Sequence, residues 1–104
     1  MKIDFTQKLV TMAGATMKDM DEKGDAIDAT LKLATINALL SPAPQGEQES
    51  GVDKIKKYEL AKMIFKSEGE VDVTAEDITL IKKCVEKSFP SPMIVGQVNE
   101  MLEK

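Results

Sequence analysis

The chain has 104 residues, of which 42% are hydrophobic and 31% are charged, and its formal net charge is −4. These values predict one small domain, residues 1–104, with a single aliphatic core. They argue against a nucleic-acid-binding protein, because the fourteen basic residues are all lysines and outnumbered by acids, whereas recognition of phosphates and guanines relies heavily on arginine.

The sequence carries no recognisable targeting signal. The first ten residues, "MKIDFTQKLV", lack the apolar segment of a signal peptide, and the apolar runs, such as "INALL", are far shorter than the roughly 20 residues of a membrane-spanning helix. The single cysteine, Cys84, has no partner for an intrachain disulfide. We therefore expect a cytoplasmic protein without a membrane span.

Residues 1–20 fit two structures. Ile3 and Phe5 alternate with polar residues, and the small pair at 13–14 favours a turn, which together indicate a short β-hairpin. Apolar residues between positions 6 and 18 also fit a helical period, which indicates a helix instead. The first structure predicts an α+β fold, with an N-terminal hairpin followed by about four helices in one compact domain. The second predicts an all-α helical bundle.

The stretch "DMDEKGDAIDAT", residues 19–30, resembles the calcium-binding loop of an EF-hand, with Gly24 at the sixth position. Two ligand positions fail, because Lys23 is a cation and Thr30 cannot supply the bidentate carboxylate. The second candidate, residues 66–77, fails further, since a lysine opens it and a valine occupies the glycine position. We interpret the first stretch as a polar turn that leads into a helix, and predict no metal site.

The first predicted helix lies in "ATLKLATINALL", with Asp28 or Thr30 as its N-cap. Its apolar face comprises Leu33, Ile36, Leu39 and Leu40. Residues 41–50, "SPAPQGEQES", then have two prolines, a glycine and no large apolar side chain, which is typical of a flexible linker.

A second helix is predicted over residues 52–66, with Gly69 as a stop signal after it. The helical period places Tyr58, Ala61 and Phe65 along one face, with Leu60 and Ile64 beside them. The alternation in "EVDV", residues 70–73, indicates a short extended segment.

Two further helices are predicted at the C-terminal end. The helix at about 75–87 begins after a capping box formed by Thr74 and Asp77, and its apolar positions are Ile78, Ile81, Cys84 and Val85. The closing helix, residues 92–103, has Ser91 as its N-cap and Pro92 at its first position. Its apolar stripe comprises Ile94, Val95, Val98, Met101 and Leu102. Gly96 lies away from this stripe, either exposed or in contact with another backbone.

No catalytic or cofactor-binding signature is present. There is no histidine, which excludes triads and other histidine-based acid–base chemistry, and Cys84 lies on an apolar helix face, as a packing residue does. The segment "AGAT" lacks the second glycine and the lysine of a phosphate-binding loop. Met12, Met17 and Met20 are either core residues or an adaptable contact surface. We therefore predict no enzyme, no catalytic residue and no cofactor.

The order of five segments resembles a group of small proteins, about 100 residues long, from tailed bacteriophages and prophages. These segments are "MKIDF", "NALL", "KKYELAKMI", "GEVDVTAEDITLIKK" and "FPSPMIVGQVNEMLE". The resemblance covers nearly the whole chain, implies a phage or prophage origin and favours the hairpin for residues 1–20. It implies no activity and no site residues.

Two classes of function follow. The first is a non-enzymatic phage or prophage protein that acts by protein–protein contact, as an adaptor or inhibitor in the host cytoplasm. The second is a structural or assembly accessory protein of the phage head or tail. A degenerate EF-hand-like calcium-binding module is a third hypothesis. The expected partner is a protein, with neither nucleic acid nor membrane.

Overall fold

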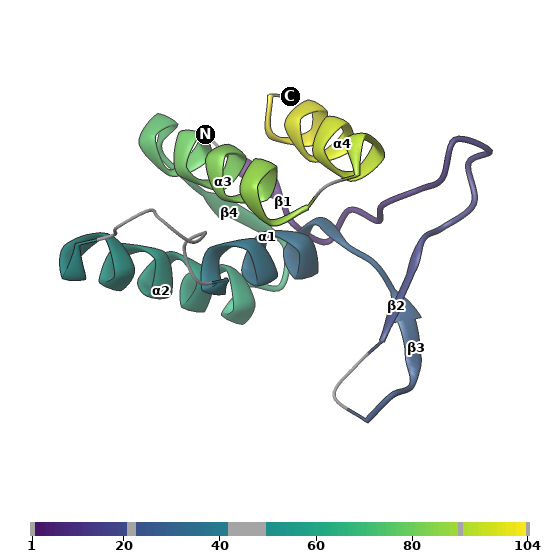
Figure 1. The fold of residues 1–104 in the computed structure, drawn as a ribbon, viewed down its shortest axis with the longest axis horizontal. Helices are drawn as coiled ribbons and strands as arrows, with labels where there is room; N and C mark the ends of the chain where they lie inside the picture. The colour runs from purple at the N-terminus through teal and green to yellow at the C-terminus, as the bar shows by residue number, and fades with distance from the viewer. Residues whose placement is uncertain (1, 21–22, 42–49, 90, 104) are drawn as a thin grey trace.

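The computed structural model describes residues 2–20, 23–41, 50–89 and 91–103 and shows an α+β fold (Figure 1). Four short strands and four helices follow one another along these residues. They are β1 (Lys2–Asp4), β2 (Lys18–Met20), β3 (Ala26–Asp28), α1 (Leu31–Leu40), α2 (Gly51–Lys66), β4 (Glu70–Asp72), α3 (Ala75–Ser88) and α4 (Pro92–Leu102). The linker predicted at 41–50 falls largely on residues 42–49, which lie outside the described residues.

The N-terminal residues are extended, so the helix predicted as the alternative for residues 6–18 is wrong. Strand β1 pairs antiparallel with β4, with Ile3 opposite Val71. The predicted alternation is confirmed, because Ile3 and Phe5 are both buried while Lys2 and Thr6 are exposed. The predicted extended segment at 70–73 is thus the partner of the first strand, across almost 70 residues of sequence.

The predicted turn at 13–14 is also present. Gly14 has a positive φ of 87°, which only glycine adopts readily, and the amide of Thr11 donates to the carbonyl of Ala15 at 2.8 Å. Val10 and Thr16 are bridged on either side of this turn. Strands β2 and β3 form a second antiparallel pair, and Figure 1 shows both turns projecting from the helical body.

Three backbone segments meet where these two turns join the body. The amide of Leu9 donates to the carbonyl of Ala29, the amide of Ala29 donates to the carbonyl of Met17, and the amide of Met17 donates to the carbonyl of Leu9, at 2.8 to 2.9 Å. The side chain of Gln97 in α4 holds the first turn from outside, because its Nε2 donates to the carbonyl of Val10 at 2.6 Å and its Oε1 accepts from the amide of Val10 at 2.9 Å. These bonds satisfy backbone groups that a two-stranded ribbon leaves unpaired.

Helices α3 and α4 agree closely with the sequence-based prediction. The capping box of Thr74 and Asp77 is formed, and the four predicted apolar positions of α3 are all buried. In α4, Pro92 is the first residue, although the side chain of Ser91 makes no capping hydrogen bond. A Cβ at Gly96 would meet no atom within 4 Å, so no other backbone approaches this glycine. Val98 and Leu102 are buried, and the remaining apolar residues of the stripe, Ile94, Val95 and Met101, are half-buried against the core.

Helix α1 packs between α2 and α3. Thr30 is its N-cap, accepting a hydrogen bond from the amide of Leu33 at 3.2 Å, which decides between the two predicted caps. Lys32 joins α1 to the end of α2, because its Nζ donates to the carbonyls of Phe65 at 3.3 Å and Ser67 at 2.5 Å. A cation at a helix C-terminus also interacts favourably with the helix dipole.

The faces of α1 and α2 differ in part from the prediction. Helix α1 buries Leu31, Ala34, Thr35, Ala38 and Leu39, and α2 buries Leu60, Ala61 and Ile64. Of the predicted apolar faces, Leu33 and Ile36 are only half-buried, and Leu40, Tyr58 and Phe65 are exposed. The physical reason is close packing: small alanines let α1 approach its neighbours, and larger side chains remain at the edge of the contact. No helix within the described residues has both the length and the hydropathy needed to cross a membrane.

Candidate functional site

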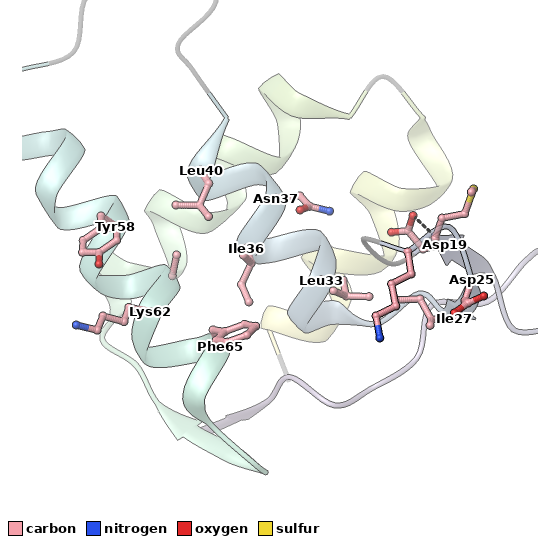
Figure 2. A pocket seen from close by; sticks show the side chains of 13 residues that line it. Asp19, Asp25, Ile27, Leu33, Ile36, Asn37, Leu40, Tyr58, Lys62 and Phe65 are labelled. Carbon is pink, nitrogen blue, oxygen red and sulfur yellow. Dashed lines mark hydrogen bonds between the residues drawn. The ribbon is translucent and has the colours of Figure 1, made fainter.

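The misassigned faces of α1 and α2 meet in an open apolar groove of about 850 Å³ (Figure 2). One wall is α1, the opposite wall is α2, and the β2–β3 pair closes one end. The groove is lined by Asp19, Met20, Lys23, Asp25, Ile27, Leu33, Ile36, Asn37, Leu40, Tyr58, Ala61, Lys62 and Phe65. Figure 2 shows Ile36 and Phe65 pointing towards each other between the two helices.

Helix α2, one wall of the groove, has more apolar residues than one packed face can cover. Five of the nine large hydrophobic side chains that are exposed among the described residues belong to this single helix. They are Val52, Ile55, Tyr58, Met63 and Phe65. A helix with apolar side chains around its circumference is normally buried on more than one side. Helix α2 therefore has an apolar surface that the described part of the chain leaves uncovered.

The α2 wall carries two exposed aromatic side chains. Tyr58 is 57% exposed and Phe65 is 68% exposed, and they lie seven residues apart, or two helical turns. The ammonium group of Lys62 lies 5.9 Å from the centre of the Tyr58 ring, within the range of a cation–π interaction. Aromatic side chains that project from a rigid helix are typical anchors of protein interfaces, because they bury a large area at a low cost in conformational entropy.

The end wall comes from the stretch that resembled a calcium loop. In the structure Gly24 has a positive φ of 85°, between β2 and β3, so the stretch lies in a hairpin-like pair of strands rather than between two helices. Asp19 accepts a hydrogen bond from the amide of Met20 at 2.8 Å, and Thr30 caps α1. The predicted turn at Gly24 is present, but strand β3 lies between it and helix α1, which the sequence-based interpretation did not include.

Ion pairs hold the base of this end wall. The carboxylate of Asp28 pairs with Lys18 on β2 and with Lys8, whose Nζ lies 3.0 Å from Oδ2 of Asp28. Hydrogen bonds from Lys18, which has the larger effect, and from Lys8 lower the pKa of Asp28 from its ordinary value. The second calcium-loop candidate, residues 66–77, does not form such a loop either, because it contains β4 and the capping box of α3.

A second, smaller hollow of about 200 Å³ adjoins the groove and shares Asp19, Leu33 and Asn37 with it. It extends towards Phe89 at the end of α3 and Ile94 in the first turn of α4. The exposed amide side chain of Asn37 thus lies between two apolar hollows. Such a group can donate to and accept from the polar groups of a bound chain.

The remaining predicted residues lie away from the groove or are separated from one another. Cys84 is buried, as predicted for a packing residue. The three methionines do not form one surface: Met12 is at the tip of the first turn and 91% exposed, Met17 is packed against the core, and Met20 lines the groove. Sequence periodicity placed several groove residues, among them Ile36, Tyr58 and Phe65, on apolar helix faces, but it did not indicate that these faces form a groove.

The groove is an open surface that presents apolar side chains to solvent. Its charged residues lie on the end wall and at Lys62, and no group of three or more residues suited to holding a metal ion occurs within the described part of the chain. Met20, Leu40, Tyr58 and Phe65 are each more than half exposed, so the groove is shallow, unlike the enclosed sites that surround small ligands. An arrangement of this kind can bury the apolar face of another polypeptide.

Comparison with known proteins adds no assignment to this geometry. No protein-family model, no curated protein and no solved structure matches the chain.

Proposed function

We propose that this chain is a small non-enzymatic phage or prophage protein that acts by protein–protein contact, as an adaptor or inhibitor in the host cytoplasm. The groove between α1 and α2 is its contact surface. The exposed aromatic pair Tyr58 and Phe65 is the observation that carries this proposal, because water-exposed aromatic rings on a rigid helix are costly unless a partner covers them. The phage origin and the cytoplasmic location rest on the sequence.

Two further observations support a contact function over catalysis. The sequence contains no histidine, and its one thiol, Cys84, is buried in the helical core. The groove residues come from α1, α2 and the β2–β3 pair, which are fixed to one another by the Lys32 bonds and by the backbone junction at Leu9 and Ala29. A preformed surface binds with a smaller loss of conformational entropy than a flexible one.

The test is affinity capture from infected or lysogenic cells, followed by mass spectrometry, with three versions of the protein. Wild type is compared with Phe65→Ser in the groove and with Met12→Ser at the tip of the first turn, which removes an even more exposed apolar side chain elsewhere. A partner retained by wild type and Met12→Ser and lost by Phe65→Ser supports the proposal. A partner lost only by Met12→Ser would assign the contact to the projecting turn. Finding the protein in purified particles would favour the structural alternative.

A further inference from the structure

The charge of helix α2 differs from that of the rest of the chain. The helix carries five lysines and two acidic residues, and so has a formal charge of +3, in a chain whose formal net charge is −4. The remaining residues therefore sum to −7. A positively charged helix with exposed apolar side chains on an otherwise acidic protein is typical of a surface that meets an acidic, apolar partner.

Two of the five lysines of α2 lie in the same row as the exposed aromatic residues, and one of them, Lys62, lines the groove. Lys54, Tyr58, Lys62 and Phe65 succeed one another at intervals of four, four and three residues, which places them in one row along the helix. Both lysines are exposed. The two acidic residues of α2, Asp53 and Glu59, are not at these intervals and fall outside the row. A side chain that covers Tyr58 therefore lies between two ammonium groups, and one that covers Phe65 lies next to that of Lys62.

The end wall of the groove, formed by the β2–β3 pair, has a different charge from the α2 wall. There Asp19 and Asp25 line the groove together with Lys23. An acidic group of a bound chain is attracted to the α2 wall and gains nothing at the end wall. The α1 wall contributes no charged residue to the groove, whereas the α2 wall contributes Lys62, so the complementary segment has its acidic residues on the flank that faces α2.

We infer that the groove receives an amphipathic helix of a partner protein whose acidic flank faces Lys54 and Lys62. This inference rests on the proposed function, since it names the partner segment for the same groove. The apolar stripe of the partner helix covers Tyr58 and Phe65, and its carboxylates pair with the two lysines. A helix suits the groove because the walls are themselves two helices, and a third packs into the furrow between them by the usual interdigitation of side chains.

Two other occupants fit the charges and the shape less well. In a symmetric dimer through this surface each copy presents the same patch, which brings two helices of charge +3 together. An anionic membrane would suit the lysines, but it would also meet the carboxylates of Asp19 and Asp25, which line the end wall of the same groove. Both remain as outcomes of the test.

The probe is a displayed library of amphipathic helices in which the apolar stripe is constant and each flanking position is randomised among Glu, Lys and Gln. Selection is carried out with wild type, with the double variant Lys54→Glu/Lys62→Glu and with Phe65→Ser. Thermal melts confirm that each variant is folded, as expected for substitutions at exposed positions. Wild type should enrich Glu on one flank, and the double variant should enrich Lys on that same flank. The best wild-type peptide should bind the double variant about tenfold more weakly, since each of the two exposed pairs contributes up to about a factor of five.

The outcomes separate this inference from the proposed function. If wild type enriches peptides without acidic preference and Phe65→Ser enriches none, the groove is a contact surface but the charge inference is wrong. If Phe65→Ser enriches the same peptides as wild type, the groove is not the contact surface and the proposed function also fails. No enrichment by wild type overturns the helical partner, while the capture experiment still decides the proposed function. Binding to vesicles of anionic lipid, or a dimer mass in solution, that is lost in Phe65→Ser would replace the partner helix by a membrane or a second copy.

Discussion

Helices α2 and α3 have similar lengths and capped N-termini, yet they differ in how completely the protein covers them. The apolar residues of α3 form one stripe, and Ile78, Ile81, Cys84 and Val85 are all buried. Those of α2 extend around the helix, and five of its large side chains are exposed. One layer of neighbouring elements can bury only one face of a helix. A helix with apolar residues on several sides therefore has an exposed apolar surface that another molecule can cover. The four predictions that follow test this contrast, from the largest expected effect to the smallest.

The same substitution, valine to aspartate, should unfold the protein when made in α4 and leave it folded when made in α2. Val98 in α4 is fully buried, and an aspartate there places an unpaired charge in the core. We expect a loss of more than about 3 kcal/mol, which leaves the protein unfolded or aggregated. Val52 is 74% exposed in the first turn of α2, where a negative charge interacts favourably with the helix dipole. Val52→Asp should leave the melting temperature almost unchanged.

Thermal melts and masses in solution provide the measurement for this pair. An unchanged melting temperature for Val98→Asp, together with a reduced mass, would mean that the stripe of α4 is a contact surface between chains. The distinction between the buried stripe of α4 and the exposed apolar surface of α2 would then be wrong.

Truncation of apolar side chains gives the second prediction. Ile81→Ala in α3 removes a fully buried side chain and should cost about 2 to 5 kcal/mol of unfolding free energy. Phe65→Ala in α2 removes a larger but mostly exposed side chain and should cost less than about 1 kcal/mol. Urea denaturation of the two variants measures both values. A cost for Phe65→Ala equal to that of Ile81→Ala would show that the groove belongs to the core of the free protein.

The third prediction concerns the attachment of the first turn to α4. Gln97→Ala removes both hydrogen bonds to the backbone of Val10 and should lower the unfolding free energy by about 1 kcal/mol, as expected for such bonds near the surface. Hydrogen exchange should accelerate at the amide of Val10 and leave α3 unaffected. Gln97→Glu is the matched control, because it retains the acceptor for that amide and loses only the donor. Equal exchange rates in wild type and Gln97→Ala would contradict the role of Gln97.

The smallest effect should come from the ion pairs at the base of the end wall. The pKa of Asp28 is lowered in the folded protein by Lys18 and Lys8, so the carboxylate stabilises the fold above its unfolded pKa of about 3.9. This contribution is lost as the pH falls through the folded pKa. The melting temperatures of wild type and Asp28→Asn should therefore differ at neutral pH and converge in acid. An NMR titration midpoint for Asp28 at or above 3.8 would contradict the ion pairs.

The sequence was informative about the helices and about the caps that begin them. Thr74 and Asp77 identified the start of α3, Pro92 identified the start of α4, and the glycine pattern identified the turns at Gly14 and Gly24. These are local signals, because a cap or a positive φ depends on residues within a few positions of one another. The alternation of Ile3 and Phe5 likewise identified the strand that buries them.

The sequence selected several residues of the candidate site, but it did not predict that they lie together in a groove. The periodicity of α1 and α2 selected Leu33, Ile36, Tyr58 and Phe65, which line the groove. Periodicity reports which side of a helix is apolar, and a core face and a binding face have the same pattern. The lysines of α2 were visible in the sequence as well, but their relation to the groove depends on which side of the helix is covered.

The sequence by itself determined the caps, the turns, the four helices and the aliphatic character of the core, because each follows from neighbouring residues or from composition. Tertiary structure alone decided that β1 pairs with β4, that the polar stretch after Asp19 forms an end wall, and that α2 presents Tyr58 and Phe65 to solvent. The reason is steric. Small residues such as Ala34 and Ala38 let α1 pack closely against its neighbours, and only this packing fixes which apolar side chains fit inside and which remain in the open groove.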